Sequence, residues 1–417
     1  NWQKTSSSLL PAVALLYPFQ VAKQSCTQIC GAWKKVYMKM AAGKRPDGSM
    51  ETKRSLFGFT NRLFSESDCW RMPSDGVYVG DHPLGPFTLQ TSNPFSAKPG
   101  GFATGAGHGS TITDRFGNYW HVSTMRISIN HDFERRIGIF PAGFDEDGVL
   151  FCNQNFADYP PKIPQAPFDA KNQQPEWMLL SYHKPVTVSS CAEGSSPDLA
   201  VDENIRTWWS AATAEPGQWI MVDLEKECDV RAVQVNLADE GLKVQFLDDS
   251  YGDVRHTRHI ELRPQISRYR VERSLDGCSW ELLDDVEREC CNGYCECTQG
   301  ARARYIRVTA NQLPYGQALR VSGLRVFGSG EGEKTQQAKA SGERTTPLDA
   351  KISWAPVEDA QGCNVVYGIA PDKLYHSWLV YGAQEVTLST LIADQKYFVR
   401  VDSFNENGIT PGVVFVV

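Results

Sequence analysis

The chain has 417 residues, of which 41% are hydrophobic and 22% charged, and its 42 Lys and Arg against 49 Asp and Glu give a formal net charge of −7. This length corresponds to roughly two to four domains, and the hydrophobic fraction is ordinary for globular modules, which excludes disorder as the main state. The thin negative charge excludes an overall basic nucleic-acid-binding protein, and no apolar run is long enough to predict a membrane span.

The first 73 residues differ in charge from the rest of the chain. Residues 1–72 contain 11 Lys and Arg against 4 acids, whereas acids exceed bases in the remainder. We detect no sustained helix or strand period in this part. Two interpretations remain: a basic arm for an anionic ligand or, as we favour, a segment foreign to the rest. Residues 1–73 are therefore left as an unassigned basic segment.

From residue 74 onward, short apolar or alternating runs separated by turn residues predict an all-β chain. Residues 110–123 read as a hairpin with its turn at Asp114–Asn118. The closely spaced prolines of residues 160–182 predict a stiff connector. Residues 329–346 lack aromatic and branched aliphatic side chains and predict a flexible linker. Three β modules result, at residues 74–159, 183–328 and 347–417.

The last module, residues 347–417, resembles a fibronectin type III domain. Trp354 stands in an early strand, and Leu391 precedes Tyr397 by six residues, which is the arrangement of a tyrosine corner. The resemblance implies a two-sheet sandwich that serves as a spacer more often than as a binding site.

Residues 183–328 resemble a discoidin-type domain, also called a coagulation-factor type C domain, whose jelly-roll sandwich is common among carbohydrate-binding modules. The matching segments are Ala200–Trp209 (AVDENIRTWW), Trp219–Leu224 (WIMVDL), Ser274–Gly277 with Trp280, Ala303–Val308 (ARYIRV) and Ser322–Gly328 (SGLRVFG). We interpret Trp209, Trp219 and Trp280 as core residues of this sandwich.

This resemblance also implies two kinds of ligand. Members of the family often hold a structural calcium ion, and Asp202 and Thr207 fit that pattern, but Gly323 occupies the place of the expected late Glu. Calcium therefore remains an open alternative, since hard cations need several oxygen ligands. Sugars are held by aromatic faces and planar polar groups, so Arg206 and Trp208 are the predicted sugar-binding residues, although Trp208 could equally be a core residue.

Residues 74–159 resemble the end of a family 43 glycoside hydrolase, a five-bladed β-propeller. The resemblance lies in Asp75–Asp81 (DGVYVGD), Pro83–Phe87 (PLGPF), Gly101–Ser110 (GFATGAGHGS) and Glu134–Phe144 (ERRIGIFPAGF). It implies that His108 lies at the bottom of the central cavity and that Arg135 points toward the sugar. His121 and His131 are interpreted as blade or surface histidines instead.

Family 43 enzymes resemble inverting glycosidases, which use an Asp base, a Glu acid and a second Asp that tunes the acid. The chain contains only about two partial blades, and we find no counterpart of these three carboxylates. Residues 30–33 (CGAW) faintly resemble the segment around the acid, with Cys30 in place of the Glu. The catalytic residues are therefore unknown, and we expect a truncated or frame-shifted origin upstream of residue 74.

The chain has 12 cysteines, and four of them fall in the run CCNGYCEC at residues 290–297. Their spacing lacks the paired C-x-x-C elements of a structural zinc site, which favours a local disulfide or free thiols over zinc. The modular β architecture and the sugar-directed resemblances favour a secreted or periplasmic location.

The resulting hypothesis is a glycoside hydrolase of polysaccharide degradation with an appended carbohydrate-binding module and no organic cofactor. The alternative is a non-catalytic carbohydrate-binding or adhesion protein built of β modules. In both cases the predicted partner is a polysaccharide or oligosaccharide, with no nucleic acid and no membrane span. The missing carboxylates favour the alternative for this molecule, whereas the propeller resemblance favours a hydrolase lineage.

Overall fold

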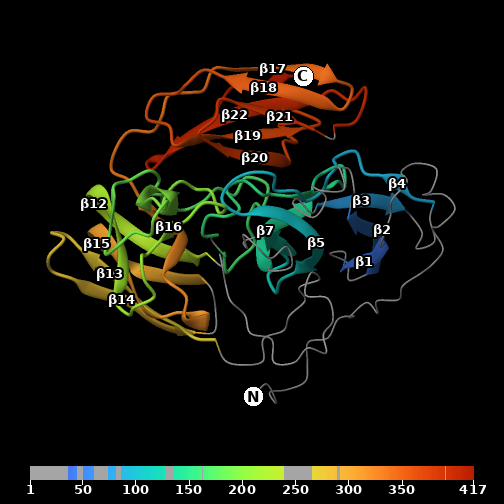
Figure 1. Cartoon of the computed structure of the whole chain (residues 1–417). Helices are drawn as coiled ribbons and strands as arrows, with labels where there is room; N and C mark the ends of the chain where they lie inside the picture. The colour runs from blue at the N-terminus through green and yellow to red at the C-terminus, as the bar shows by residue number, and fades with distance from the viewer. Residues whose placement is uncertain are drawn as a thin grey trace, which may run out of the picture.

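The structure, a computed structural model, is built from β-strands and short connections (Figure 1). This confirms the all-β prediction. Neither short 3₁₀ helix, η1 (Pro197–Ala200) or η4 (Pro314–Gly316), has the length of a membrane-spanning helix, and no other helix occurs among the described residues. The structure describes residues 36–44, 50–60, 74–80, 86–126, 135–161, 163–238, 265–288, 292–389 and 391–417.

Two four-stranded antiparallel sheets form the N-terminal part, each a meander of the kind found in propeller blades. The first contains β1 (Val36–Lys44), β2 (Met50–Thr60), β3 (Asp75–Gly80) and β4 (Thr88–Leu89) in that order. The second contains β5 (Thr104–Thr113), β6 (Tyr119–Arg126), β7 (Arg135–Phe144) and β8 (Leu150–Cys152).

The first sheet corrects our interpretation of residues 1–73 as a segment without strands. The second half of β2 pairs with the whole of β3, from Ser55 opposite Gly80 to Thr60 opposite Asp75. A register shift between Lys39 and Ala41 interrupts the pairing of β1 with β2. Such an irregularity breaks the two-residue period, which explains why the sequence pattern missed these strands.

The predicted hairpin is present between β5 and β6. The carboxylate of Asp114 accepts hydrogen bonds from the backbone of Phe116 and Asn118 and from the indole of Trp120. Burial raises the pKa of Asp114, but these hydrogen bonds outweigh it and hold the pKa at about 2. Gly117 takes the left-handed conformation, with φ of 87°, that this turn requires.

The middle module is a β-sandwich around two long strands, β12 (Gln218–Leu237) and β15 (Asn292–Gln312). The first half of β12 lies between β10 (Val186–Val188) and β15, and its second half lies between β15 and β16 (Arg320–Ser329). Other strands of this module are β9 (Met178–Leu179), β11 (Trp209–Ser210), β13 (Ser267–Ser274) and β14 (Glu281–Arg288). Its core is apolar, with Ile220, Val235 and Ile306 almost completely buried.

The C-terminal module is a second sandwich with sheets of three and five strands. One sheet contains β17 (Ala340–Thr346), β18 (Asp349–Trp354) and β21 (Glu385–Leu388). The other contains β19 (Gly362–Gly368), β20 (His376–Tyr381), β22 (Phe398–Asn405), β23 (Gly408–Thr410) and β24 (Phe415–Val416). The hydroxyl of Tyr397 accepts a hydrogen bond from the backbone of Ile392, as in a tyrosine corner.

Residues 329–346, predicted as a flexible linker, are placed within this C-terminal module. Gly330 donates its backbone N–H to the carbonyl of Glu406, and the hydroxyl of Thr335 bonds to that of Ser403. Residues 340–346 form β17. Backbone groups and small polar side chains make these contacts, so composition alone gave no sign of them.

Residues 160–182, predicted as a stiff connector, fold back before they enter the sandwich. The side-chain amide of Asn153 donates hydrogen bonds to the carbonyls of Ala170 and Gln173. The segment then ends in β9, which pairs with β16.

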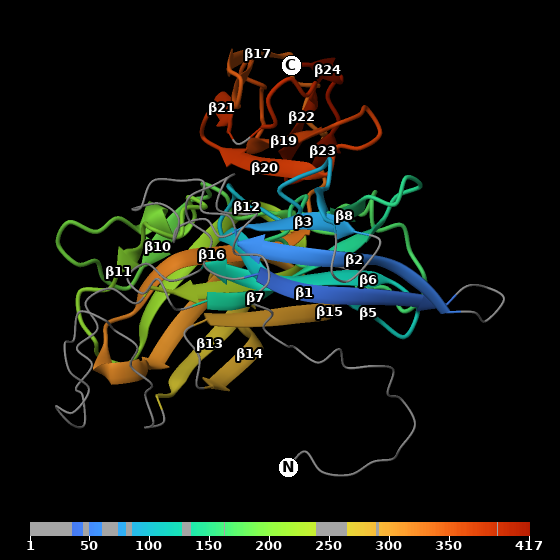
Figure 2. The same ribbon diagram turned by 90° about the vertical axis from the view of Figure 1, so that its right-hand side faces the viewer.

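The three parts meet in a shared core, with the C-terminal sandwich lying across the other two (Figures 1 and 2). Its buried members come from all three parts: Phe156, Tyr159, Met178, Leu179, Ala232, Phe327, Leu379 and Phe404. The hydroxyls of Tyr159 and Tyr381 are 2.8 Å apart across this junction. We refer to this shared core as the three-way junction.

Candidate functional site

The predicted sugar-binding residues lie on one turn, residues 202–208, between η1 and β11. The carboxylate of Asp202 accepts the backbone N–H of Asn204 at 2.9 Å and the hydroxyl of Thr207 at 2.6 Å. The same hydroxyl lies 2.8 Å from the carbonyl of Asn204. Short polar side chains that bond to nearby backbone groups favour such turns, so the local sequence itself closes this one.

Two buried residues fix the turn from below. Glu203 has a left-handed φ of 58°, and both of its carboxylate oxygens bond to the guanidinium of Arg325 at 2.9 Å. Ile205 is buried in the hydrophobic cluster that includes Phe95 and Phe102 of the N-terminal part. The turn is therefore held by both the sandwich and the N-terminal sheets.

Arg206 and Trp208 are both accessible on this turn, as is the exposed Asn204. Arg206 is exposed and Trp208 is half-buried, whereas the adjacent Trp209 is completely buried. The structure thus brings the two predicted sugar-binding residues together on one accessible turn. An indole beside a guanidinium on a fixed turn offers an apolar face and a planar hydrogen-bond donor.

The tryptophans outside this turn correct part of our core assignment. Trp209 is a core residue as predicted, but Trp219 and Trp280 are only half-buried. The Arg307 guanidinium lies 3.8 Å from the centre of the Trp280 ring, a cation–π contact. Trp219 takes the outward position on β12, next to the fully buried Ile220.

Four buried charges lie beneath the turn. The ammonium of Lys98 is 3.3 Å from the carboxylate of Asp158, and Arg325 donates to the carbonyl of Asp158 at 2.7 Å. Burial raises the pKa of Asp158, but Lys98 and Arg325 outweigh it and hold that pKa low. Burial lowers the pKa of Lys98 and raises that of Glu203. We call Lys98, Asp158, Glu203 and Arg325 the charge quartet.

The residues at the predicted calcium site do not fit that ion well. The oxygens of Asp202 and Thr207 are already hydrogen-bonded to each other. A Cβ on Gly323, where the late Glu is expected, would lie 2.6 Å from the ring of Phe102. Glu203, the buried acid next to Asp202, is taken by Arg325. Among the described residues no group of three or more His, Cys, Asp or Glu could hold a metal ion.

Of the residues predicted in the N-terminal part, His108 contributes its backbone to a second cluster, which is centred on Asp75 and also contains His121. The carboxylate of Asp75 accepts the backbone N–H groups of His108 at 2.9 Å and Gly109 at 2.8 Å. The Nε2 atom of His121 is buried 3.4 Å from the same carboxylate. The exposed His108 has a left-handed φ of 57°. Arg135 begins β7, but its side chain and His131 lie outside what the structure describes.

The cysteine run is only partly within the described residues. Cys295 and Cys297 are free thiols on β15, whereas Cys290 and Cys291 lie outside this part. A hydrogen bond from the Cys295 thiol lowers the pKa of Cys297 to about 7. No disulfide joins the cysteines that the structure describes, which are Cys152, Cys191, Cys228, Cys278, Cys295, Cys297 and Cys363.

Sequence reasoning found the turn but missed the residues that anchor it. Arg325 interrupts the apolar run Leu324–Phe327, and a charged residue at a core position signals a buried ion pair. No local pattern pointed to its partner, because Glu203 is 122 positions away along the chain.

Comparison with known proteins identifies the module that carries the turn. Among solved structures, the chain resembles a glycoside hydrolase with 15% identity, 70% of this chain and 60% of that chain covered, and a TM-score of 0.34. It also resembles the family 32 carbohydrate-binding module of C. perfringens NanJ, solved in complex with galactose, with 17% identity and a TM-score of 0.27. This match covers 36% of this chain and 98% of that module. It also resembles chitosan-binding module 1 of a chitosanase/glucanase from Paenibacillus sp. IK-5, with 18% identity and a TM-score of 0.28. This match covers 36% of this chain and 99% of that module.

The chain spans 60% of the length of that hydrolase. No curated protein matches it. Residues 199–308, which include the whole turn, match the model of the F5/F8 type C family of NedA-like, galactose-binding domains, and this part of the chain is therefore similar to a carbohydrate-binding module.

Proposed function

We propose that this protein binds the sugar units of a polysaccharide or oligosaccharide through the turn at residues 202–208. The observation that carries this proposal is that Arg206 and Trp208 are accessible within the region that matches a galactose-binding family. Pyranose rings have an apolar C–H face and a rim of hydroxyls. The Trp208 indole would pack against the face, and the Arg206 guanidinium would donate to neighbouring hydroxyls.

The anchoring of the turn supports this proposal energetically. A binding loop that is already ordered loses little conformational entropy when its ligand arrives. Glu203 and Ile205 hold the backbone before Arg206, and the buried Trp209 holds it after Trp208, so the turn is fixed before the sugar binds. Ordering the turn therefore subtracts only a little from the favourable free energy of the weak sugar contacts.

The test is calorimetric titration of the full chain with galactose and with a galactose-terminated oligosaccharide. We expect Trp208→Ala and Arg206→Ala each to weaken binding at least tenfold without changing the unfolding transition. Trp219→Ala, which removes another half-buried indole of the same sandwich, is the matched control and retains binding. Unchanged affinity in both turn variants would rule out this turn as the site.

A glycosidase is the second candidate function, because Asp75, His108 and His121 form a polar cluster in blade-like sheets. In this version the sheets hydrolyse O-glycosidic bonds of a polysaccharide and the sandwich holds the substrate. We expect Asp75→Asn to abolish release of aryl sugar from chromogenic glycosides while sugar binding persists. If the full chain hydrolyses none of a panel of glycosides, the glycosidase candidate is wrong and only the binding function remains. We also propose a periplasmic or secreted location, where a polysaccharide from outside the cell would be met.

A further inference from the structure

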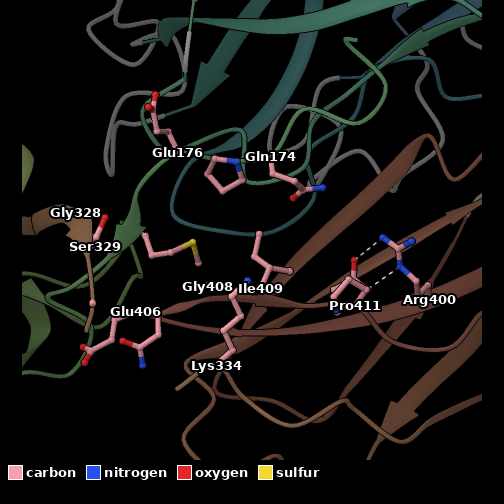
Figure 3. Close-up of a pocket in the computed structure, with 15 residues that line it drawn as sticks. Gln174, Glu176, Gly328, Ser329, Lys334, Arg400, Glu406, Gly408, Ile409 and Pro411 are labelled. Atoms are coloured by element: carbon pink, nitrogen blue, oxygen red, sulfur yellow. Dashed lines mark hydrogen bonds and ion pairs between the residues drawn. The ribbon is translucent and has the colours of Figure 1, made fainter. Parts of the chain in front are cut away.

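We propose that a pocket between the sandwiches is a second saccharide site, which holds one neutral pyranose unit. The class of ligand, a saccharide, rests on the proposed function, whereas the location of the site rests on the pocket alone. The pocket has a volume of about 320 Å³ and is formed by the end of the connector, the end of β16 and the C-terminal sandwich (Figure 3). This volume lies at the lower end of small-molecule sites, as expected for a single sugar unit.

The walls of the pocket combine apolar and polar groups, as an amphipathic ring requires. Met178 and Ile409 supply apolar surface, and Gln174, Glu176 and Ser329 supply hydrogen-bonding groups. Figure 3 shows Gln174, Glu176, Ser329 and Ile409 around a common space, with Glu176 and Gln174 on one side and Ile409 opposite them. Both faces of a pyranose therefore find a chemically matched surface.

The charged residues of the walls are held in place and largely neutralised. Arg400 binds Asp402 through two hydrogen bonds of 2.7 Å. The carboxylate of Glu406 pairs with Lys184 at 3.4 Å and with Lys226 at 2.5 Å. Paired carboxylates keep lone pairs that accept hydroxyl protons, but they exert little net field. The two other charged residues of the lining, Glu176 and Lys334, are of opposite sign, so the lining as a whole favours a neutral polyol over an anion or a cation.

Two further side chains complete the floor of the pocket. Asn407 accepts the N–H of Gly332 and donates to the carbonyl of Glu333, both at 2.8 Å, so its amide is fixed. The stem of Lys334 lies against Gly408, where a Cβ would be 2.7 Å from its Cε. Within the described residues no ion pair or hydrogen bond engages the Lys334 ammonium, which leaves its three donors for sugar hydroxyls.

The experiment titrates the full chain with the methyl glycosides of galactose, glucose, mannose and N-acetylglucosamine, and resolves the two sites with variants. Ser329→Trp fills the pocket from an exposed position, and Lys334→Ala removes its free donor. Ser341→Trp, at an exposed serine of β17 outside the pocket, is the matched control. We expect two sites in the wild type, one in Ser329→Trp, one in Trp208→Ala and none in the double variant. Lys334→Ala should weaken the pocket site at least fivefold.

The outcomes separate the two proposals. If Ser329→Trp keeps full stoichiometry and Trp208→Ala abolishes all binding, the pocket proposal is overturned and the proposed function stands. If Ser329→Trp alone abolishes binding, the turn is not a site and the pocket is. If no neutral glycoside binds, or galacturonate or glucosamine binds tenfold more tightly in the pocket, the neutral-sugar assignment is wrong.

Discussion

The core of the middle sandwich and the three-way junction are stabilised in different ways. The sandwich core consists of apolar side chains such as Ile220 and Ile306, whose burial is favourable in many orientations. The junction combines apolar and aromatic side chains with the charge quartet, whose bonds require exact distances and angles. We infer that each module tolerates small core changes, whereas the placement of one module on another does not.

The largest expected effect comes from breaking the charge quartet. Arg325→Leu leaves Glu203 and Asp158 buried beside a single cation, which should cost about 3–5 kcal/mol of unfolding free energy. Urea unfolding of the full chain measures this loss of unfolding free energy. The control is Arg268→Leu, which breaks an exposed ion pair with Glu287 and should lower the unfolding free energy by less than about 1 kcal/mol. Similar losses in the two variants would contradict a special role of the junction.

Acid should weaken the contact between the C-terminal sandwich and the N-terminal part, next to the junction, before it affects the core of the middle sandwich. His376 of the C-terminal sandwich is buried 3.3 Å from the Ser92 hydroxyl, and burial lowers its pKa to about 4. Unfolded His titrates near 6.5, so the unfolded chain binds the proton first. The stability that neutral His376 contributes is therefore complete above pH ~6.5 and declines toward pH ~4, by on the order of 3 kcal/mol.

The measurement is thermal unfolding from pH 7.5 to 4.5. His376→Gln cannot take up the proton and should show a shallower decline over this range. The lowered pKa of Asp145, which burial raises but Lys373 and Tyr375 hold down, affects stability only at more acidic pH. If wild type and His376→Gln show the same pH profile of thermal unfolding, protonation of His376 is not the cause of the loss of stability in acid.

The smallest expected effect tests the sandwich core. Ile220→Val deletes one buried methylene and should cost about 0.5–1.5 kcal/mol, with the module arrangement unchanged. Urea unfolding gives the free energy, and limited proteolysis reports whether the modules stay together. A loss as large as that of Arg325→Leu would show that the sandwich core is no more tolerant than the junction.

The sequence predicted those features that depend on neighbouring residues. Period-two runs and turn residues located many of the longer strands, such as β6, β12 and β22, and the turn that presents Arg206 and Trp208 could be found from its own residues. The anchors of that turn could not be found, because Ile205 and Glu203 contact residues far away in the chain. Residues 329–346 pack through backbone hydrogen bonds, which almost any residue can make, so their composition was misleading.

Gly323 has a consequence for how this arrangement can change by mutation. The resemblance to discoidin-type domains implies an acid at this position, but here it faces the ring of Phe102, which would lie 2.6 Å from any Cβ. A Glu at residue 323 would therefore have to displace Phe102 and disturb the packing of the N-terminal part against the sandwich. The docking of the N-terminal part thus restricts the side chain that this position of the sandwich can carry.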